Sequence, residues 1–326
     1  PVAVAAQEAG VDGFCVAVID EAVALRENGI TKPILILGAS PETEAPYMAK
    51  FNLSTAVSDL HFLQTAQPLL AVQNLKLKVH LALDRGMGRI GFRDQETVKA
   101  AIEFMKQHQA QFEFEGIFTH FSTADSADDT YYKKLLNKFH ELMEVVAHRP
   151  RYVHVANSAA SIWHKQCGGN MIRLGIGMYG LNPSGKEVQL PHDVALKPAF
   201  ELTSHIVEVK QVHPGDSISY GTTYTATKDE WIGTVPMGYA DGWLRRMQGS
   251  TVLVDGQECE IVGRICMDQF MIRLPHEVPL GTKVTLIGEN GGKQKTAQDA
   301  ADYAGTIHYE ILCSIGQRVP RFYVEK

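Results

Sequence analysis

The sequence of 326 residues contains little cysteine, and its five cysteines are scattered and odd in number. No CxxC pair occurs, so we predict neither a disulfide framework nor a metal site. No apolar run approaches the ~20 residues of a membrane helix, and no signal-peptide pattern opens the chain. Lys and Arg (31) do not outnumber Asp and Glu (37), which argues against nucleic acid as a partner. We therefore expect a cytoplasmic protein that binds neither a membrane nor nucleic acid.

The composition, with 45% apolar and 21% charged residues, is ordinary for a packed globular protein. In the first part of the chain, short apolar runs alternate with helical patterns at 20–29, 62–74, 96–110 and 131–148. The runs lie at 13–19, 32–37, 53–57, 77–83, 114–119, 152–156 and 171–179. This alternation predicts parallel βα units.

Seven strands are one short of a (β/α)8 barrel, which typically needs ~250 residues. The chain begins with Pro1, and a helix over 1–10 precedes the first strand. We therefore expect a barrel that lacks its first strand, because a segment before Pro1 is missing from the sequence. An open doubly wound sheet is the alternative, but no GxGxxG motif opens a helix here.

The pattern changes after Pro198. Short strands separated by Pro-Gly, Asp-Gly and Leu-Gly turns are predicted at 202–212, 217–224, 231–236, 251–255, 261–265, 271–274 and 283–287. A helix over 296–304, capped by Thr296, and a closing element over 309–315 follow. We expect a barrel domain over 1–193 and an all-β domain over 194–326.

Chemistry-bearing residues follow the predicted barrel strands, where catalytic groups of such barrels lie. Arg89 and Arg173 indicate an anionic ligand, and Ser158 with the N–H groups of 175–177 suits a phosphate. Arg173 lies between two apolar residues and, if buried, needs a partner. The alternatives are that His154 is a hydrogen-bonded core residue and that the glycine-rich segment around Arg89 is a plain turn.

The β-domain has its own unusual segments. Tyr220 lies in 219–224, Tyr239 lies in a turn over 236–243, and 263–269 combines Cys266 with Asp268. The alternative is that the tyrosines pack at a domain or subunit interface. Cys266 beside Met267 is otherwise an ordinary buried pair.

Seven segments in this order resemble the alanine racemase family across essentially the whole chain. They are Asp84–Gly91, His154–Ala160, Met171–Gly180, Ser219–Gly221, Gly238–Trp243, Gly263–Asp268 and His308–Glu310. The resemblance implies a pyridoxal 5′-phosphate-binding barrel followed by a β-domain. It also implies a homodimer in which the β-domain completes the partner subunit's active site, and interconversion of L- and D-alanine.

The resemblance also assigns cofactor-binding residues. Arg173 is expected at the pyridine nitrogen, where a fixed cation opposes protonation and makes the ring a weaker electron sink. That favours racemisation over side reactions. His120 is expected beside the ring, and His154 is expected to orient Arg173. The residues implied to hold the phosphate are Ser158, Gly175, Ile176 and Tyr309.

For the substrate, the resemblance implies that Arg89 meets the cofactor's phenolic oxygen and the substrate carboxylate. The Met267 N–H is expected at the same carboxylate, and Tyr239 is expected to narrow the entrance. Tyr220 of the partner subunit is expected to be one of two acid/base groups, with a pKa lowered by the cationic site. Supporting residues are Asn157, Arg264, Cys266 and Asp268.

The family's other base is the Schiff-base lysine of a Lys-Ala-x-x-Tyr-Gly-type motif on the first barrel strand, and no lysine here has that context. Lys78 lies at the beginning of its predicted strand, away from the end where catalytic groups lie, so it does not replace that lysine. We expect the missing strand and the missing lysine to belong to the same segment, which lies before Pro1. Ala82 stands where some relatives carry a carbamylated lysine that steadies the arginine.

Several alternatives remain: a racemase for another small amino acid, a pyridoxal-phosphate decarboxylase, a non-catalytic cofactor-binding protein or an inactive truncated form. Arg173 argues against a decarboxylase, since those enzymes generally place a carboxylate at the pyridine nitrogen.

Overall fold

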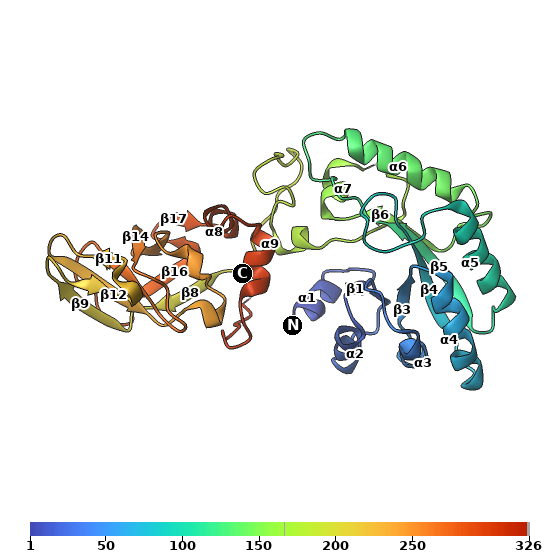
Figure 1. Ribbon diagram of the computed structural model, residues 1–326, viewed down its shortest axis with the longest axis horizontal. Coiled ribbons are helices and arrows are strands. Elements are labelled where there is room, and N and C mark those ends of the chain that lie inside the picture. Colours follow the sequence, from blue (N-terminus) through green and yellow to red (C-terminus); the bar gives the residue numbers. More distant parts are fainter. Residues whose placement is uncertain (166, 325–326) are drawn as a thin grey trace. The chain divides into compact units, whose positions relative to one another are not determined.

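The chain divides into a parallel α/β unit and an antiparallel β unit (Figure 1). The computed structural model describes residues 1–165 and 167–324. The first unit comprises Pro1–Met178 and Asn182–Ala195, and the second comprises Tyr179–Leu181 and Leu196–Lys326.

Seven strands form the sheet of the first unit, and every neighbouring pair is parallel. They follow the chain order as β1 (Phe14–Val16), β2 (Ile34–Ile36), β3 (Ser54–Val57), β4 (Leu77–Leu83), β5 (Phe112–Thr119), β6 (Tyr152–Ala156) and β7 (Met171–Ile172). The helices are α1 (Val2–Glu8), α2 (Ile19–Glu27), α3 (Ala45–Lys50), α4 (Leu60–Val72), α5 (Gln95–Gln107), α6 (Thr130–Met143) and α7 (Ser158–Trp163). The sheet curls, with α3 to α6 along its outer side (Figure 1).

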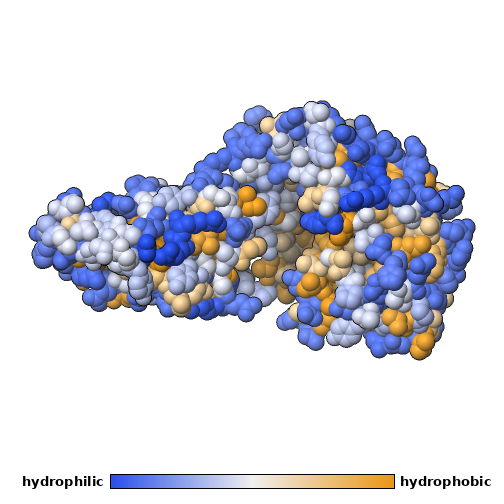
Figure 2. Space-filling model, in the orientation of Figure 1, coloured by the Kyte–Doolittle hydropathy of each residue, from blue (hydrophilic) through white to orange (hydrophobic). Residues whose placement is uncertain are grey.

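The sheet is open between its first and last strands. β1 and β7 are its edges, and no pairing joins them within the described part of the chain. Strands β2 and β3 are buried throughout, whereas Ile172 of β7 is 57% exposed. Apolar atoms also reach the surface of this unit in Figure 2, and half-exposed Val2 and Val4 of α1 are among its exposed apolar residues. The prediction of a barrel one strand short of eight is thus confirmed.

Amphipathic helices hold the outer layer on the sheet. In α6, the buried residues Tyr132, Leu135, Phe139 and Leu142 recur at the three- and four-residue spacing of one helix face. Each buried leucine or phenylalanine contributes ~1.5–3 kcal/mol through removal of apolar surface from water. This packing fixes the outer side of the sheet.

One predicted strand is wrong. The apolar segment 171–179 forms only the two-residue β7, and Ile176–Tyr179 forms a 3-10 helix. The physical reason lies in α7, where the Ser158 hydroxyl accepts hydrogen bonds from the N–H groups of Gly175 and Gly177. These two bonds turn the backbone out of the extended conformation.

The second unit is built on an antiparallel sheet in the order β17-β16-β13-β14-β15-β12-β9, with β8 paired to β16. Its strands are β8 (Leu202–His205), β9 (Glu208–Val212), β12 (Glu230–Val235), β13 (Thr251–Val254), β14 (Gln257–Val262), β15 (Phe270–Leu274), β16 (Lys283–Asn290) and β17 (Lys293–Lys295). A separate pair, β10 (Ser217–Ile218) and β11 (Tyr224–Thr225), and helices α8 (Ala297–Ala304) and α9 (His308–Ser314) complete it. The predicted β-domain is confirmed.

Two predicted strands of this unit are broken. The run 202–212 forms β8 and β9, which pair with β16 and β12 respectively. The run 217–224 is interrupted by a 3-10 turn at Tyr220–Thr222, where Thr222 and Gly221 have positive φ angles of 49° and 72°. Extended backbone cannot pass through such angles, so Tyr220 lies in a turn.

The Thr296 cap of α8 is directly testable. Its hydroxyl accepts a hydrogen bond from the Asp299 N–H, and the Asp299 carboxylate accepts from the Thr296 N–H. Thr296→Ala should lower the free energy of unfolding by about 1 kcal/mol in urea titrations. Thr296→Ser keeps the oxygen and should retain most of the stability, so equal losses in both variants would contradict the cap.

Candidate active site

A buried guanidinium occupies the carboxyl ends of β5, β6 and β7. Arg173 is 9% exposed, and its Nη1 donates to His154 Nδ1 (2.7 Å) and to the His154 carbonyl (2.9 Å). Its Nη2 donates to the Thr119 carbonyl (2.9 Å) and lies 3.4 Å from His120 Nδ1. The Phe118 ring lies 5.4 Å from the guanidinium carbon and stacks on His154. No carboxylate among the described residues pairs directly with Arg173.

Burial and like charge keep the neighbouring histidines neutral. Burial, and then the charges of Arg173 and Arg89, lowers the pKa of His120 to about 4. Burial, and then the charge of Arg173, hold the pKa of His154 well below its ordinary value. Burial also lowers the pKa of Arg173 to about 10, which leaves it protonated at neutral pH. The centre therefore carries positive charge on its arginines alone.

Hydrogen-bond donors gather around the first residue of α7. The Ser158 Oγ accepts from the Gly175 N–H (2.8 Å) and the Gly177 N–H (3.3 Å). Asn157 caps α7 by accepting from the Ala160 N–H (2.9 Å). In this structure the two N–H groups donate to Ser158, and redirected to an anionic oxygen they would form a donor set with its hydroxyl at the ends of β6 and β7.

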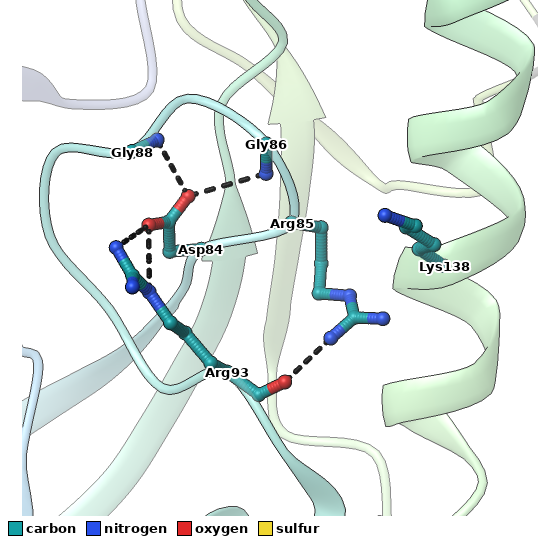
Figure 3. Close-up of a pocket in the computed structure, with 6 residues that line it drawn as sticks. All are labelled: Asp84, Arg85, Gly86, Gly88, Arg93 and Lys138. Carbon is teal, nitrogen blue, oxygen red and sulfur yellow. Dashed lines mark hydrogen bonds and ion pairs between the residues drawn. The ribbon is translucent and has the colours of Figure 1, made fainter.

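The loop after β4, which carries the exposed Arg89, is held by Asp84 (Figure 3). One carboxylate oxygen accepts from the N–H groups of Gly86 (3.2 Å) and Gly88 (2.9 Å), and the other accepts from Arg93 (3.0 Å). Burial alone raises the pKa of Asp84, but these hydrogen bonds outweigh it and the pKa is lowered. Asp84 therefore stays ionised and anchors the loop.

A shallow pocket of about 270 Å³ lies beside this loop (Figure 3). Its lining is Asp84, Arg85, Gly86, Gly88, Arg93 and Lys138. Neither Arg173 nor His154 lines it, so the pocket is separate from the guanidinium centre.

Sequence reasoning missed a buried polar network below Arg173. His80 of β4 lies 2.8 Å from His154 through their ring nitrogens, and 3.0 Å from the carboxylate of Glu115 on β5. Glu115 also accepts from the Ser54 hydroxyl (2.5 Å) on β3. The available signal was one histidine and one glutamate inside neighbouring strands predicted to be buried.

In the second unit, Tyr220 is 70% exposed and stands in a turn backed by Arg264. The Ser219 hydroxyl donates to the Arg264 carbonyl (2.5 Å). A Cβ on Gly221 would come within 2.7 Å of the Arg264 side chain. Contacts with Arg264 thus hold the turn in place, while the Tyr220 side chain projects from the surface of this unit.

Tyr239 and Met267 lie on two loops joined by backbone hydrogen bonds. The Tyr239 N–H donates to the Cys266 carbonyl (3.2 Å), and the Ala240 N–H donates to the Met267 carbonyl (2.9 Å). A Cβ on Gly238 would lie 2.3–2.4 Å from those two carbonyl oxygens, so only glycine permits this approach. The structure thereby brings these predicted residues together.

The remaining predicted residues of this unit lie close to its chain end. The Asp268 carboxylate accepts a hydrogen bond from Arg318 (2.6 Å). Tyr309 lies in the first turn of α9, with its ring 4.7 Å from that of His308. Of the predicted site residues, the structure thus brings His120 and His154 to Arg173, and Tyr239 to Cys266 and Met267.

Two further features bear on function. Among residues 1–165 and 167–324, no helix is long and apolar enough to cross a membrane. Within the same residues, no group of three or more His, Cys, Asp or Glu side chains could hold a metal ion.

A curled parallel sheet with a cationic, donor-rich centre at its carboxyl ends, followed by a β-domain, defines a barrel-type enzyme. Sequence models of the alanine racemase N-terminal domain and C-terminal domain match residues 1–183 and 199–323. The chain therefore belongs to the alanine racemase family, whose members are isomerases.

Individual relatives agree along almost the whole chain. Alanine racemase of Ligilactobacillus salivarius is 61% identical over 99% of this chain and 86% of its own. The crystal structure of alanine racemase from E. faecalis is 50% identical, with a TM-score of 0.96 over 99% of this chain and 86% of that one. A histidine racemase from Leuconostoc mesenteroides subsp. sake is 33% identical, with a TM-score of 0.93 over 99% and 87%.

The lowered histidine pKa values predict acid sensitivity. In the unfolded chain, His120 and His154 take up protons near pH ~6.5, whereas the folded protein resists protonation until lower pH. The unfolded state thus binds more protons, and the free energy of unfolding should fall as pH is lowered from ~6.5 towards ~4.

His120→Asn should reduce this pH dependence, measured by urea unfolding at about pH 7 and about pH 5. His61→Asn is the matched control, because the His61 side chain is 77% exposed. An unchanged slope in His120→Asn would contradict the neutral state of this histidine.

Proposed function

We propose that this protein interconverts L- and D-alanine with pyridoxal 5′-phosphate as its cofactor. The observation that carries the proposal is the buried, protonated Arg173, which is oriented by His154 and forms no direct pair with a carboxylate of residues 1–165 or 167–324. A buried cation of this kind requires an interaction partner. An electron-rich ring nitrogen would be such a partner, since it accepts a hydrogen bond without carrying a proton.

The donor set fits this cofactor. Ser158 and the N–H groups of Gly175 and Ile176 would hold its phosphate with Tyr309, and Arg173 would bind its ring nitrogen. His120, neutral and half-buried beside Arg173, would pack against the ring. When bound, the cofactor withdraws electrons from the amino acid and so acidifies its Cα–H bond.

The two arginines would have different roles, one at the cofactor ring and one at the substrate. Arg173 stays protonated and would oppose protonation of the ring nitrogen of the bound cofactor, which would limit side reactions. Arg89, on the loop anchored by Asp84, would bind the substrate carboxylate together with the Met267 N–H. Both contacts orient Cα for proton removal, and orientation lowers the barrier without new chemistry.

Racemisation needs one acid/base group on each face of Cα. Tyr220 would serve one face in the site of a partner subunit of a homodimer, where cations would favour its ionised form. The second acid/base group is the lysine of the family's motif. None of the lysines among these 326 residues lies in that motif, so the proposal requires the working protein to carry such a lysine. Tyr239 would narrow the entrance to the site.

The intact mass and absorption spectrum of the purified protein test this requirement. A mass above 36.0 kDa together with a yellow band of bound cofactor supports the proposal. A mass of 36.0 kDa without that band contradicts it and favours an inactive form.

Tyr220→Phe tests the second base. The side chain keeps its shape and loses the only group that exchanges a proton, so kcat for D-alanine formation from L-alanine should fall by ~10²–10⁴-fold. Deuterium incorporation at Cα in heavy water should fall in one direction of the reaction more than in the other. Tyr323→Phe, at another exposed tyrosine, is the control and should not change kcat.

Substrate preference is tested by comparing alanine with histidine. The relatives with 50–61% identity are alanine racemases, whereas the histidine racemase is 33% identical. We expect kcat/KM for alanine to exceed that for histidine by at least ~10²-fold, because a site closed around a methyl group excludes an imidazole. A ratio in favour of histidine would reassign the substrate.

A further inference from the structure

A continuous hydrogen-bonded chain runs through the interior of the first unit, from Arg173 to the carboxylate of Glu115. Arg173 Nη1 meets His154 Nδ1 (2.7 Å), and His154 Nε2 meets His80 Nδ1 (2.8 Å). His80 Nε2 then meets the carboxylate of Glu115 (3.0 Å). Both histidines and Glu115 are at most 4% exposed, so water does not compete for these bonds.

The chemistry of its two ends fixes the direction of every bond in this chain. A guanidinium only donates, so His154 Nδ1 must accept and the single proton of His154 lies on Nε2. That proton is donated to His80 Nδ1, which leaves the proton of His80 on Nε2, facing Glu115. A doubly protonated His80 would donate to His154 Nε2 and so force the proton of His154 onto Nδ1. Two donors, His154 Nδ1 and Arg173 Nη1, would then face each other.

Glu115 is equipped to stay ionised at the far end. Burial raises the pKa of its carboxyl, but the hydrogen bonds from His80 and Ser54 outweigh burial, and the pKa is lowered. The chain thus joins a buried cation to a buried anion through two neutral imidazoles. Such a pair offsets part of the cost of burying each charge.

The backbone is adapted to this chain at two places. Pairing between β4 and β5 shifts register after Val79, so that Glu115 is skipped and His80 lies opposite Gly116. A Cβ on Gly116 would lie 2.3 Å from His80 Nδ1. A second register shift follows His154 in the pairing of β6 with β7. Such bulges re-aim side chains near functional sites.

We propose that Glu115 and His80 are positioning residues that fix the proton of His154 and thereby hold Arg173 in a single donating orientation. The functional consequence rests on the proposed racemase activity, in which Arg173 binds the cofactor ring. The proton order itself does not depend on that activity.

The proton order is measured on the unaltered protein, with its histidines labelled with ¹⁵N. We expect two slowly exchanging imidazole N–H resonances from His80 and His154, each with the proton on Nε2. His80→Gln and His154→Gln assign them, because each variant removes its own signal. A proton on Nδ1 of His154, or a doubly protonated His80 at neutral pH, would overturn the proposal.

Glu115→Gln tests the charge at the end of the chain. The amide oxygen still accepts from His80 but polarises the bonds less, so both resonances should move to higher field. We expect kcat for alanine to fall ~10-fold, the scale of change seen when outer partners of functional groups are removed, while KM changes less than ~2-fold. Glu113→Gln removes an exposed carboxylate from the same strand and should change neither readout.

The outcomes separate this proposal from the proposed function. If the unaltered protein does not racemise alanine, the resonances still decide the proton order. If it does, a Glu115→Gln variant that matches Glu113→Gln in kcat and in both resonances would overturn the positioning role. If Glu115→Gln does not fold, the resonances of the unaltered protein remain the deciding measurement.

Discussion

The first unit is organised around one buried positive charge. Arg173 lies at the ends of three strands, where its hydrogens meet a histidine ring and two backbone carbonyls rather than a carboxylate. Isolated burial of a cation costs several kcal/mol. The hydrogen-bonded chain connects Arg173 to an anion, Glu115, through two imidazoles, while its other guanidinium nitrogen lies beside His120.

This arrangement constrains the strands that carry it. His80, Glu115 and His154 come from three adjacent strands, and the pairing shifts register beside Glu115 and beside His154. Gly116 leaves the space that the His80 ring fills. A regular parallel sheet alternates its side chains strictly between two faces, whereas the pairing here passes from Phe114 to Gly116 and skips Glu115. The register shifts and the glycine thus lie at the residues that form the polar chain.

The sequence predicted what local patterns determine. The run 77–83 was predicted with the bounds that β4 has, and the cap at Thr296 begins α8 as expected. The segment 171–179 was predicted wrongly as a strand, because the hydrogen bonds that turn it come from Ser158, in a different βα unit. The His80–Glu115 pair was missed for the same kind of reason, since a register shift depends on the neighbouring strand.

The fold by itself does not select the substrate. A histidine racemase shares it with a TM-score of 0.93 at 33% identity, so a curled sheet with this β-domain accommodates side chains as different as methyl and imidazole. The proposed contacts of Arg173 and Arg89 reach only the cofactor and the carboxylate that all amino acids share. Discrimination must then come from groups that meet the substrate side chain. The loops of Tyr239 and Met267 are suited to this, because backbone hydrogen bonds hold them together while both side chains stay exposed. Residues on such rigid loops can change without disturbing the charge balance at Arg173.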